Sequence, residues 1–182
     1  TVSGTSISFG TEVVFNAANT FHTAGIYDSV NQKVIALYSD GGDGDKGKAV
    51  IGTVSGTSIS FSSAITFSTS GITETSAAYS AASSSVIVSY RIAPQGYGTV
   101  ISGAISASNI VFDSAVTFTT DNTGYTASVY DSNAAKYAIS FQDKDNSNQG
   151  ESLVFTDASS NSTSFIGIAS EAISNTATGA IN

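Results

Sequence analysis

The chain repeats itself with a period of 52 residues. The segment Thr1-Val-Ser-Gly-Thr-Ser-Ile-Ser-Phe9 recurs letter for letter at residues 53–61, and a looser third copy surrounds Phe112, 51 residues after Phe61. A period of this length indicates an array of supersecondary units, none of which buries its apolar face alone. The repeat also lowers the expectation of an enzyme, because catalysis needs a unique group of residues whereas a repeat presents the same residues several times.

Aromatic residues recur at the same two spacings, 52 and then 51 residues. The series are Phe9, Phe61 and Phe112; Phe15, Phe67 and Phe118; Tyr27, Tyr79 and Tyr130; and Tyr38, Tyr90 and Phe141. They predict one β domain over residues 1–173, with unit 1 at about 16–67, unit 2 at 68–118 and unit 3 at 119–173. An extra strand segment, 1–15, precedes the units, and residues 174–182 form a tail or the start of a further domain.

Four short strands are expected in each unit. The first strands are predicted at 23–28, 74–79 and 125–130, the second at 33–38, 85–90 and 136–141, the third at 49–54, 99–105 and 152–156, and the fourth at 7–15, 59–67 and 110–118. Residues 34–38 form a nearly continuous apolar run, which is typical of a strand buried on both faces. The fourth strands alternate instead, with a break that indicates a bulge. A weaker fourth-strand copy is expected at 162–173, and no stretch has the 3.6-residue period of a helix.

Four antiparallel strands in a unit of about 50 residues are typical of a β-propeller blade. A β-trefoil, which also has three units of four strands, is the alternative. Three blades are fewer than the four to eight of typical propellers. We therefore expect a ring completed by other sequence or by a second copy. Because the sequence begins at Thr1 in the middle of a repeat, we also expect a processed chain or a piece of something longer. The open ends should be covered, and their apolar residues are Val13, Phe15, Phe155, Phe165 and Ile168.

The composition limits the classes of partner that the chain is expected to bind. The net charge is −8, with five Lys and one Arg, which argues against nucleic acid and anionic membranes as partners. No apolar run approaches the roughly 18 residues that cross a bilayer. Cys and Met are absent, which excludes disulfides and thiolate metal sites and suits an extracellular protein.

The repeat motif resembles repeats in large virion proteins of marine tailed bacteriophages. It consists of Gly-Thr-Val-Ser-Gly-Thr-Ser-Ile-Ser-Phe (52–61), Val-Val-Phe-Asn-Ala (13–17), Tyr-Asp-Ser (27–29) and Lys-Val-Ile-Ala-Leu-Tyr (33–38), and residues 164–173 are similar to a segment that often follows such repeats. The resemblance covers most of residues 1–173. It implies a tail-fibre-like structural or adhesive role on the virion, outside the cell, with other virion subunits or copies of itself as partners, and it brings no catalytic residues. Unit 2 departs from the motif, with Tyr79-Ser80 in place of Tyr-Asp.

The glycine-rich loop at 40–48 superficially matches nucleotide-binding motifs. Gly42, Gly44 and Gly47 fit the dinucleotide pattern, and the loop nearly fits a P-loop, except that Ala49 stands where Ser or Thr would hold Mg²⁺. Both motifs need a helix after the loop. A strand is expected here, and three Asp residues would repel phosphate, so nucleotide binding is disfavoured.

Two acidic loops are candidate calcium sites, because carboxylate oxygens are ligands that Ca²⁺ prefers. Their acidic residues are Asp40, Asp43 and Asp45 in unit 1, and Asp143, Asp145 and Glu151 in unit 3. Neither loop has the EF-hand spacing, and the loop of unit 2 has no acid. Solvated hairpin loops, in which Asp, Asn and Gly satisfy turn geometry, are the favoured alternative. No other cofactor is expected.

Single polar residues give little sign of catalysis. Asp28 and Asp131 begin equivalent hairpin turns, and this recurrence favours Asx turns over acid–base carboxylates. His22 is the only histidine, so it cannot form a multi-histidine metal site. Arg91 is the only arginine, which argues against a sialidase-like propeller with several arginines around the substrate carboxylate.

The remaining candidates for ligand binding are Phe21, His22, Tyr97 and Tyr125. In a propeller they would share one face with the two acidic loops, and tyrosine beside Asp and Asn suits sugar binding through stacking and hydrogen bonds. Alternatively, these rings merely pack down the loops. The sequence thus favours a non-enzymatic virion module that contacts a host receptor. The alternatives are a secreted lectin-like module that binds a cell-surface glycan and, less favoured, a glycan-degrading enzyme.

Overall fold

The structure is a computed structural model, and it describes residues 2–3, 6–7 and 9–156. The strands are β1 (Val2–Ser3), β2 (Ser6–Ile7), β3 (Thr20–Asp28), β4 (Lys33–Asp40), β5 (Lys46–Ser55), β6 (Ser58–Phe61), β7 (Ile65–Ser80), β8 (Ser85–Ile92), β9 (Tyr97–Ile105), β10 (Ile110–Phe112), β11 (Val116–Asp131), β12 (Lys136–Asp143) and β13 (Gln149–Thr156). The only helical element in the described part is a 3-10 turn, η1 (Gly41–Asp43). The predicted all-β class is confirmed. No helix among the described residues has the length and apolar character needed to span a membrane.

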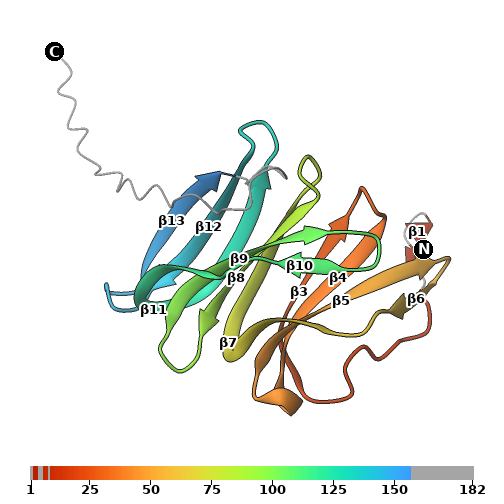
Figure 1. Cartoon of the computed structure of the whole chain (residues 1–182), viewed down its shortest axis with the longest axis horizontal. Coiled ribbons are helices and arrows are strands. Elements are labelled where there is room, and N and C mark those ends of the chain that lie inside the picture. The colour runs from red at the N-terminus through yellow and green to blue at the C-terminus, as the bar shows by residue number, and fades with distance from the viewer. Residues whose placement is uncertain (1, 4–5, 8, 157–182) are drawn as a thin grey trace.

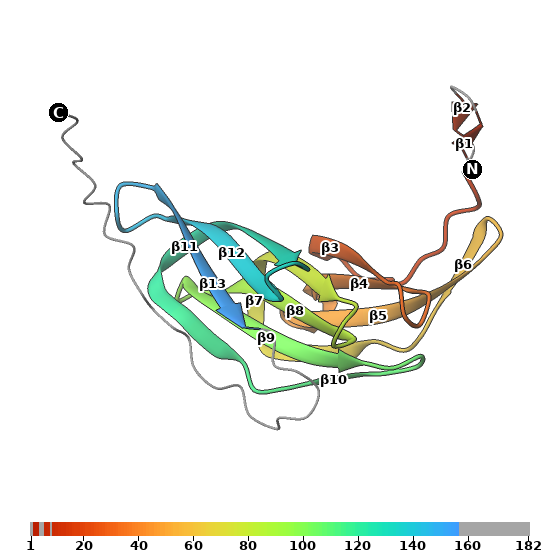
Figure 2. The same cartoon turned by 90° about the horizontal axis from the view of Figure 1, so that it is seen from above.

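Eleven strands form one antiparallel sheet that is not closed on itself (Figure 1). Their order is β3-β4-β5-β7-β8-β9-β11-β12-β13, with β6 paired to β5 and β10 paired to β9. Apart from β6 and β10, the sheet is therefore a meander in which successive strands are neighbours, as short connections favour. The pair β1–β2 forms a separate small hairpin away from the sheet (Figure 2).

Two strands are longer than the sequence predicted. β7 runs unbroken over residues 65–80, pairing with β5 through its first part and with β8 through its second. β11 links β9 to β12 in the same way. The second half of the predicted fourth strand of one unit therefore continues into the first strand of the next. The first half, before the predicted break, forms a short separate strand, β6 in unit 1 and β10 in unit 2.

The predicted strand at 7–15 is wrong. Only Ser6–Ile7 of this region lies in a strand, and residues 9–19 have no regular structure. The equivalent strands β6 and β10 pair with the third strands β5 and β9, whereas residues 9–15 pair with no strand in the described part of the chain. Phe15 nevertheless packs against Tyr38 and Phe61, with ring centroids 5.1 and 5.5 Å apart. Val13 is 43% exposed.

The strand pairing recurs at the spacing of the sequence repeat. The hairpins of the three units close with the pairs Asp28–Lys33, Ser80–Ser85 and Asp131–Lys136. Each first strand also has a register shift, which follows Phe21, Thr73 and Gly124. The strand order within residues 23–67 is the same as within 74–118. The β-propeller and β-trefoil interpretations concern how such units are arranged around an axis, and they stay predictions.

Side chains of β8 alternate between two buried clusters. Val86, Val88 and Tyr90 belong to a cluster with Ile35 and Leu37 of unit 1. On the other side of the strand, Ile87 belongs to a second cluster, whose unit 3 members include Tyr137, Ile139 and Phe141. Unit 2 therefore lies between units 1 and 3.

Each unit has two faces, which we define by the second strand. The front face carries Val34 and Ala36 in unit 1, Val86 and Val88 in unit 2, and Tyr137 and Ile139 in unit 3. The back face carries Ile35 and Leu37, Ile87 and Ser89, and Ala138 and Ser140 in the same order. The front face of one unit packs on the back face of the unit before it.

Phenylalanines at the ends of the predicted fourth strands complete both clusters. The Phe67 ring lies 5.5 Å from that of Tyr90, between centroids. A Cβ on Gly47 would lie 2.4 Å from the Phe67 ring, and a Cβ on Gly98 would lie equally close to that of Phe118. Glycine is therefore required at both positions for the close approach of the rings.

The far end of the sheet is partly covered within the described residues. Phe155 is buried and its ring stacks on that of Tyr137, with centroids 5.6 Å apart. The other predicted end residues, Phe165 and Ile168, and the strand copy at 162–173 lie outside the described residues.

Candidate functional site at the loop end of the sheet

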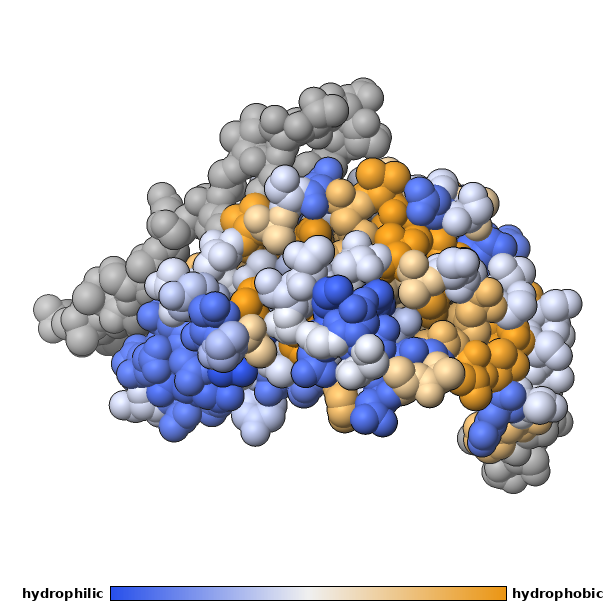
Figure 3. All heavy atoms as spheres, turned by 60° about the horizontal axis from the view of Figure 1, so that its bottom comes forward, coloured by the Kyte–Doolittle hydropathy of each residue, from blue (hydrophilic) through white to orange (hydrophobic). Residues whose placement is uncertain are grey.

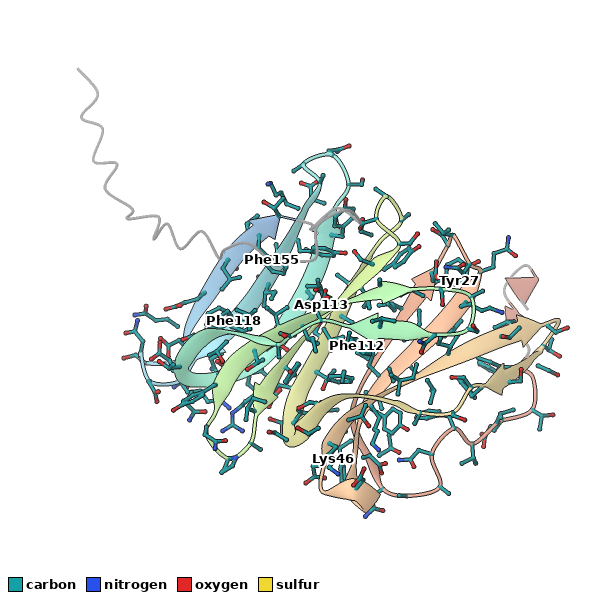
Figure 4. All side chains as sticks on the ribbon, in the orientation of Figure 1. Tyr27, Lys46, Phe112, Asp113, Phe118 and Phe155 are labelled. Carbon is teal, nitrogen blue, oxygen red and sulfur yellow. The ribbon has the colours of Figure 1, made fainter. Side chains whose placement is uncertain are left out.

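The sheet has two polar ends. The loop end carries the connections 41–45, 93–96 and 144–148 between second and third strands, and the hairpin end carries the turns 29–32, 81–84 and 132–135. Figure 4 shows Lys46 beside the loop end and Tyr27 near the opposite one. The acids of the loop end lie far from Asp28 and Asp131, because Asp28 and Asp40 close opposite ends of the β3–β4 pair.

A bulge in the first strand of each unit shapes the loop end. His22, Glu74 and Tyr125 occupy equivalent positions and have φ values of 49°, 54° and 49°. This left-handed conformation is uncommon for residues other than glycine. A backbone hydrogen bond recurs beside each bulge, from the amides of Gly41, Ala93 and Lys144 to the carbonyls of Asn19, Gly71 and Asn122, respectively. The same backbone hydrogen bond thus holds the loop of each unit against its first strand.

The acids of the first loop have different partners. The Asp40 carboxylate accepts hydrogen bonds from the Gly42 amide at 3.1 Å and from the Asn16 side chain at 3.2 Å, and so caps η1. Asp43 forms ion pairs with Lys46 at 2.8 Å and Lys48 at 2.7 Å. Hydrogen bonds from these two lysines lower the pKa of Asp43 to about 2. Asp43 is therefore ionised near neutral pH and is not suited to act as a general acid.

The Asp45 residue of the same loop contributes through its backbone. Its φ is 59°, and its carbonyl accepts hydrogen bonds from the Ile72 amide at 2.9 Å and the Ser39 hydroxyl at 3.0 Å. The first of these bonds joins the loop of unit 1 to β7. Asp45 thus helps to fix the position of unit 2 relative to unit 1.

The third loop is built on an Asx turn. Asp143 is buried and its carboxylate accepts hydrogen bonds from the amides of Asp145 at 2.9 Å and Asn146 at 3.2 Å. The Asp145 carboxylate accepts from the Asn122 amide at 2.8 Å. Glu151 is exposed on β13. No group of three or more metal-ligating side chains occurs among the residues that the structure describes, and calcium binding stays a prediction.

Three aromatic candidates are exposed at the loop end. Phe21 is 47% exposed, Tyr97 38% and Tyr125 72%. Lys144 lies over the Tyr125 ring, 5.7 Å from its centroid. Phe21 lies against the first loop, since a Cβ on Gly41 would lie 2.7 Å from its ring. The exposed His22 completes the set, and all four predicted ligand residues therefore belong to this end.

The loop end presents chemically different regions (Figure 3). Hydrophilic residues gather on the side where β12 and β13 lie, and hydrophobic residues gather toward the side of β3–β6. Exposed rings beside polar loops can stack on a flat apolar group while amides and carboxylates provide hydrogen bonds. This combination can bind a ligand that has both an apolar face and polar groups.

At the hairpin end, Asp28 has a structural role. Its carboxylate is fully buried and accepts hydrogen bonds from the amides of Val30 and Asn31, both at 3.0 Å, and from the Tyr79 hydroxyl at 2.6 Å. Burial raises the pKa of Asp28, but the hydrogen bonds from Tyr79, Asn31 and Val30 outweigh it, so the pKa lies below the ordinary 3.8. The predicted Asx turn is confirmed here. It is also confirmed at Asp131, which accepts from two turn amides at 2.9 and 3.1 Å.

Two further residues that join the units were not singled out from the sequence for that role. Glu74 accepts a hydrogen bond from the Tyr125 amide at 3.3 Å, and its carbonyl accepts one from Thr126. Arg91 donates to Asn122 of unit 3 at 3.1 Å. The only available signal was their position relative to the repeat, since Glu74 is equivalent to His22 and Tyr125.

No protein-family model matches the chain, and no curated protein matches it.

Proposed function

We propose that this chain is a non-catalytic structural or adhesive module of a bacteriophage virion, exposed outside the cell, where it makes a tail-fibre-like contact with a host receptor. The resemblance of the repeats supplies the virion setting. The observation that carries the adhesive role is the set of exposed rings at the loop end, of which Tyr125 is the most exposed at 72%. Rings held on a rigid sheet lose little conformational freedom on binding, which favours recognition.

Two acids with lowered pKa values, one at each end of the sheet, support a non-catalytic role. Asp43 has a pKa of about 2 because two lysines donate hydrogen bonds to it, and Asp28 is buried in a turn with its pKa also lowered. A glycosidase needs one carboxyl group that is protonated when the reaction starts. Neither Asp28 nor Asp43 meets that requirement, which makes the glycan-degrading alternative less favoured.

Each unit is best interpreted as a β-propeller-like blade. The recurring registers and the burial of β8 by a unit on each side support this proposal. In a propeller, sheets are stacked face to face around an axis, and the connections gather at the two ends. The β-trefoil alternative would be favoured if the chain closed upon itself as a monomer.

A lectin-like module is the second candidate function. Tyr125 lies beneath the Lys144 ammonium group and beside the Asx turn of Asp143. A ring with adjacent polar groups is suited to a sugar, which has an apolar face and a rim of hydroxyl groups. This candidate differs from the first in the ligand, a free or cell-surface glycan, and in secretion without a virion.

Glycan-array binding with a hydrolysis assay tests these alternatives. We expect binding without released sugar, and we expect Tyr125→Ala to lower the binding at least about tenfold if the ring stacks on the ligand. Val30→Ala is the control, because Val30 is 56% exposed in the turn at the opposite end. Equal losses in both variants would contradict a site at the loop end, and released sugar would contradict the non-catalytic proposal. Binding to host cells but to no glycan would favour the virion module over the lectin.

A further inference from the structure

Tyr27 and Asp131 are the exposed counterparts of a pair that is in contact inside the molecule. Within it, the Tyr79 hydroxyl of unit 2 donates to the Asp28 carboxylate of unit 1 at 2.6 Å. Tyr27 is the equivalent of Tyr79, 52 residues earlier, and Asp131 is the equivalent of Asp28 in unit 3. Tyr27 is 56% exposed, and Asp131 is exposed. Each end of the stack of units thus presents one half of this contact.

The faces that carry these residues are also less buried than their internal equivalents. On the front face of unit 1, Val34 and Ala36 are half-buried, whereas Val86 and Val88 of unit 2 have no exposed surface. On the back face of unit 3, Val154 is 54% exposed, whereas the equivalent Ile51 of unit 1 is 3% exposed. Both faces therefore retain apolar area that is covered wherever another unit packs against it.

Small side chains on both faces allow close approach. Where units 2 and 3 meet, the hydroxyls of Ser89 and Ser128 lie 2.7 Å apart. Ser140 is the equivalent of Ser89 on the back face of unit 3 and is exposed. Gly25 is the equivalent of Ser128 on the front face of unit 1, and the space where its Cβ would lie is open.

We propose that the front face of unit 1 binds the back face of unit 3 of a second copy of this chain, with Tyr27 donating a hydrogen bond to Asp131 of that copy. The contact continues the interface that already joins the units within the chain. It is head-to-tail, so it closes only if the copies form a ring. Two copies of three units give six blades, the only multiple of three within the four to eight of typical propellers. The choice of two copies rests on the β-propeller interpretation proposed above, whereas the contact itself does not.

Crosslinking tests the head-to-tail contact directly, because the chain has no native cysteine. Tyr27→Cys and Asp131→Cys are made as separate variants, and each is treated with a short bismaleimide crosslinker alone and in an equimolar mixture. We expect covalent pairs in the mixture and none in either variant alone. A chain with both Asp28→Cys and Tyr79→Cys is the positive control, since an internal crosslink shows that the reagent spans this geometry.

Sedimentation measures the strength of the contact without cysteines. We expect a dimer at micromolar concentration and a rise of at least about tenfold in its dissociation constant for Tyr27→Phe, because a hydrogen bond to a carboxylate is lost. Tyr97→Phe, at the loop end, should leave the constant unchanged. A monomer at all concentrations or a Tyr27→Cys variant that crosslinks to itself would overturn the head-to-tail contact. Open fibres in place of dimers would overturn the closed ring of two copies. Glycan binding through Tyr125 is measured separately and does not depend on this outcome.

Discussion

The interface between units 1 and 2 and the interface between units 2 and 3 share a backbone arrangement but differ in chemistry. The first buries Leu37, which has no exposed surface, in a hydrophobic cluster that also contains Val88 and Tyr90 of unit 2. At the equivalent position the second has Ser89, whose hydroxyl lies 2.7 Å from that of Ser128. The recurring strand pairing therefore accepts either an apolar contact or a hydrogen bond between the units. The register is set by the backbone and the turns, and the strength of each interface by a few side chains.

The largest expected difference between the interfaces is in the free energy of unfolding that is lost when the side chain is shortened to alanine at three equivalent positions. Leu37→Ala should lower the free energy of unfolding by about 3 kcal/mol, because it leaves a cavity in a closed cluster. Ser89→Ala should cost about 1 kcal/mol through the lost hydrogen bond, and Ser140→Ala, on the exposed back face, less than about 0.5 kcal/mol. Urea denaturation measures all three. Equal losses at the three positions would contradict the stacking of the units.

Alkaline pH should weaken the first interface more than the second. Burial raises the pKa of Tyr90 to about 12, and the equivalent residue in unit 3 is Phe141, which does not titrate. Because this pKa lies above the ordinary value of about 10, the contribution of Tyr90 to the free energy of unfolding is fully present below pH 10. It is lost as pH rises through about 12, on the order of 3 kcal/mol in total. Denaturation midpoints between pH 9 and pH 12 measure the loss. Tyr38 and Tyr79, whose pKa values are also raised, add smaller losses of stability in the same pH range. A Tyr90→Phe variant whose stability depends on pH as strongly as that of the native chain would contradict the assignment to Tyr90.

Removing the Tyr79 hydroxyl should weaken the first interface only. Tyr79→Phe loses a 2.6 Å hydrogen bond to a buried carboxylate, which should cost about 1.5 kcal/mol. Tyr130→Phe is the matched change in unit 3. Because Ser80 stands in unit 2 at the position of Asp28, this variant should cost less than about 0.5 kcal/mol. Thermal denaturation of both variants checks the difference, and a larger loss for Tyr130→Phe would refute it.

Low pH should lower the folding stability through Asp28, by less than the changes described above. Because the folded-state pKa of Asp28 lies below 3.8, its contribution is present above pH 3.8 and is lost as pH falls through the folded-state pKa. Stability measured between pH 5 and pH 2 should therefore fall less steeply in Asp28→Asn than in the native chain. Asp131→Asn is the comparison, since the Asp131 side chain is exposed. If only Asp131→Asn flattened the profile, the roles assigned to the two turns would be reversed.

The sequence predicted the units and most strands because turn residues and apolar positions recur at a fixed spacing. It did not reveal that residues 65–80 form one strand, since nothing in the local pattern distinguishes a turn from a bend within a strand. It also did not reveal the left-handed residues at His22, Glu74 and Tyr125, because none of them is the glycine or asparagine that marks such positions. The strand expected at 7–15 failed for a related reason, since strand formation depends on a pairing partner as well as on sequence.

At the hairpin end, opposite the candidate site, Asp28 and Asp131 were predicted correctly as turn residues, because Asx turns depend on nearby backbone amides. The ion pairs of Asp43 were harder to foresee, although Lys46 and Lys48 are close in sequence. Their geometry depends on η1 and on the start of β5, which together bring both ammonium groups to one carboxylate. The bond between Tyr79 and Asp28 spans 51 residues and follows from the stacking of units, which local patterns do not contain.

Amide hydrogen exchange of the isolated chain, measured at a concentration low enough to prevent association, tests the stacking of the units most directly. β4, β8 and β12 are all second strands with a paired strand on each side, but only β8 is covered on both faces by neighbouring units. We therefore predict that the amides of residues 86–91 exchange most slowly and that those of 34–39 and 137–142 exchange faster. Exchange in β8 that is as fast as in β4 and β12 would contradict the account.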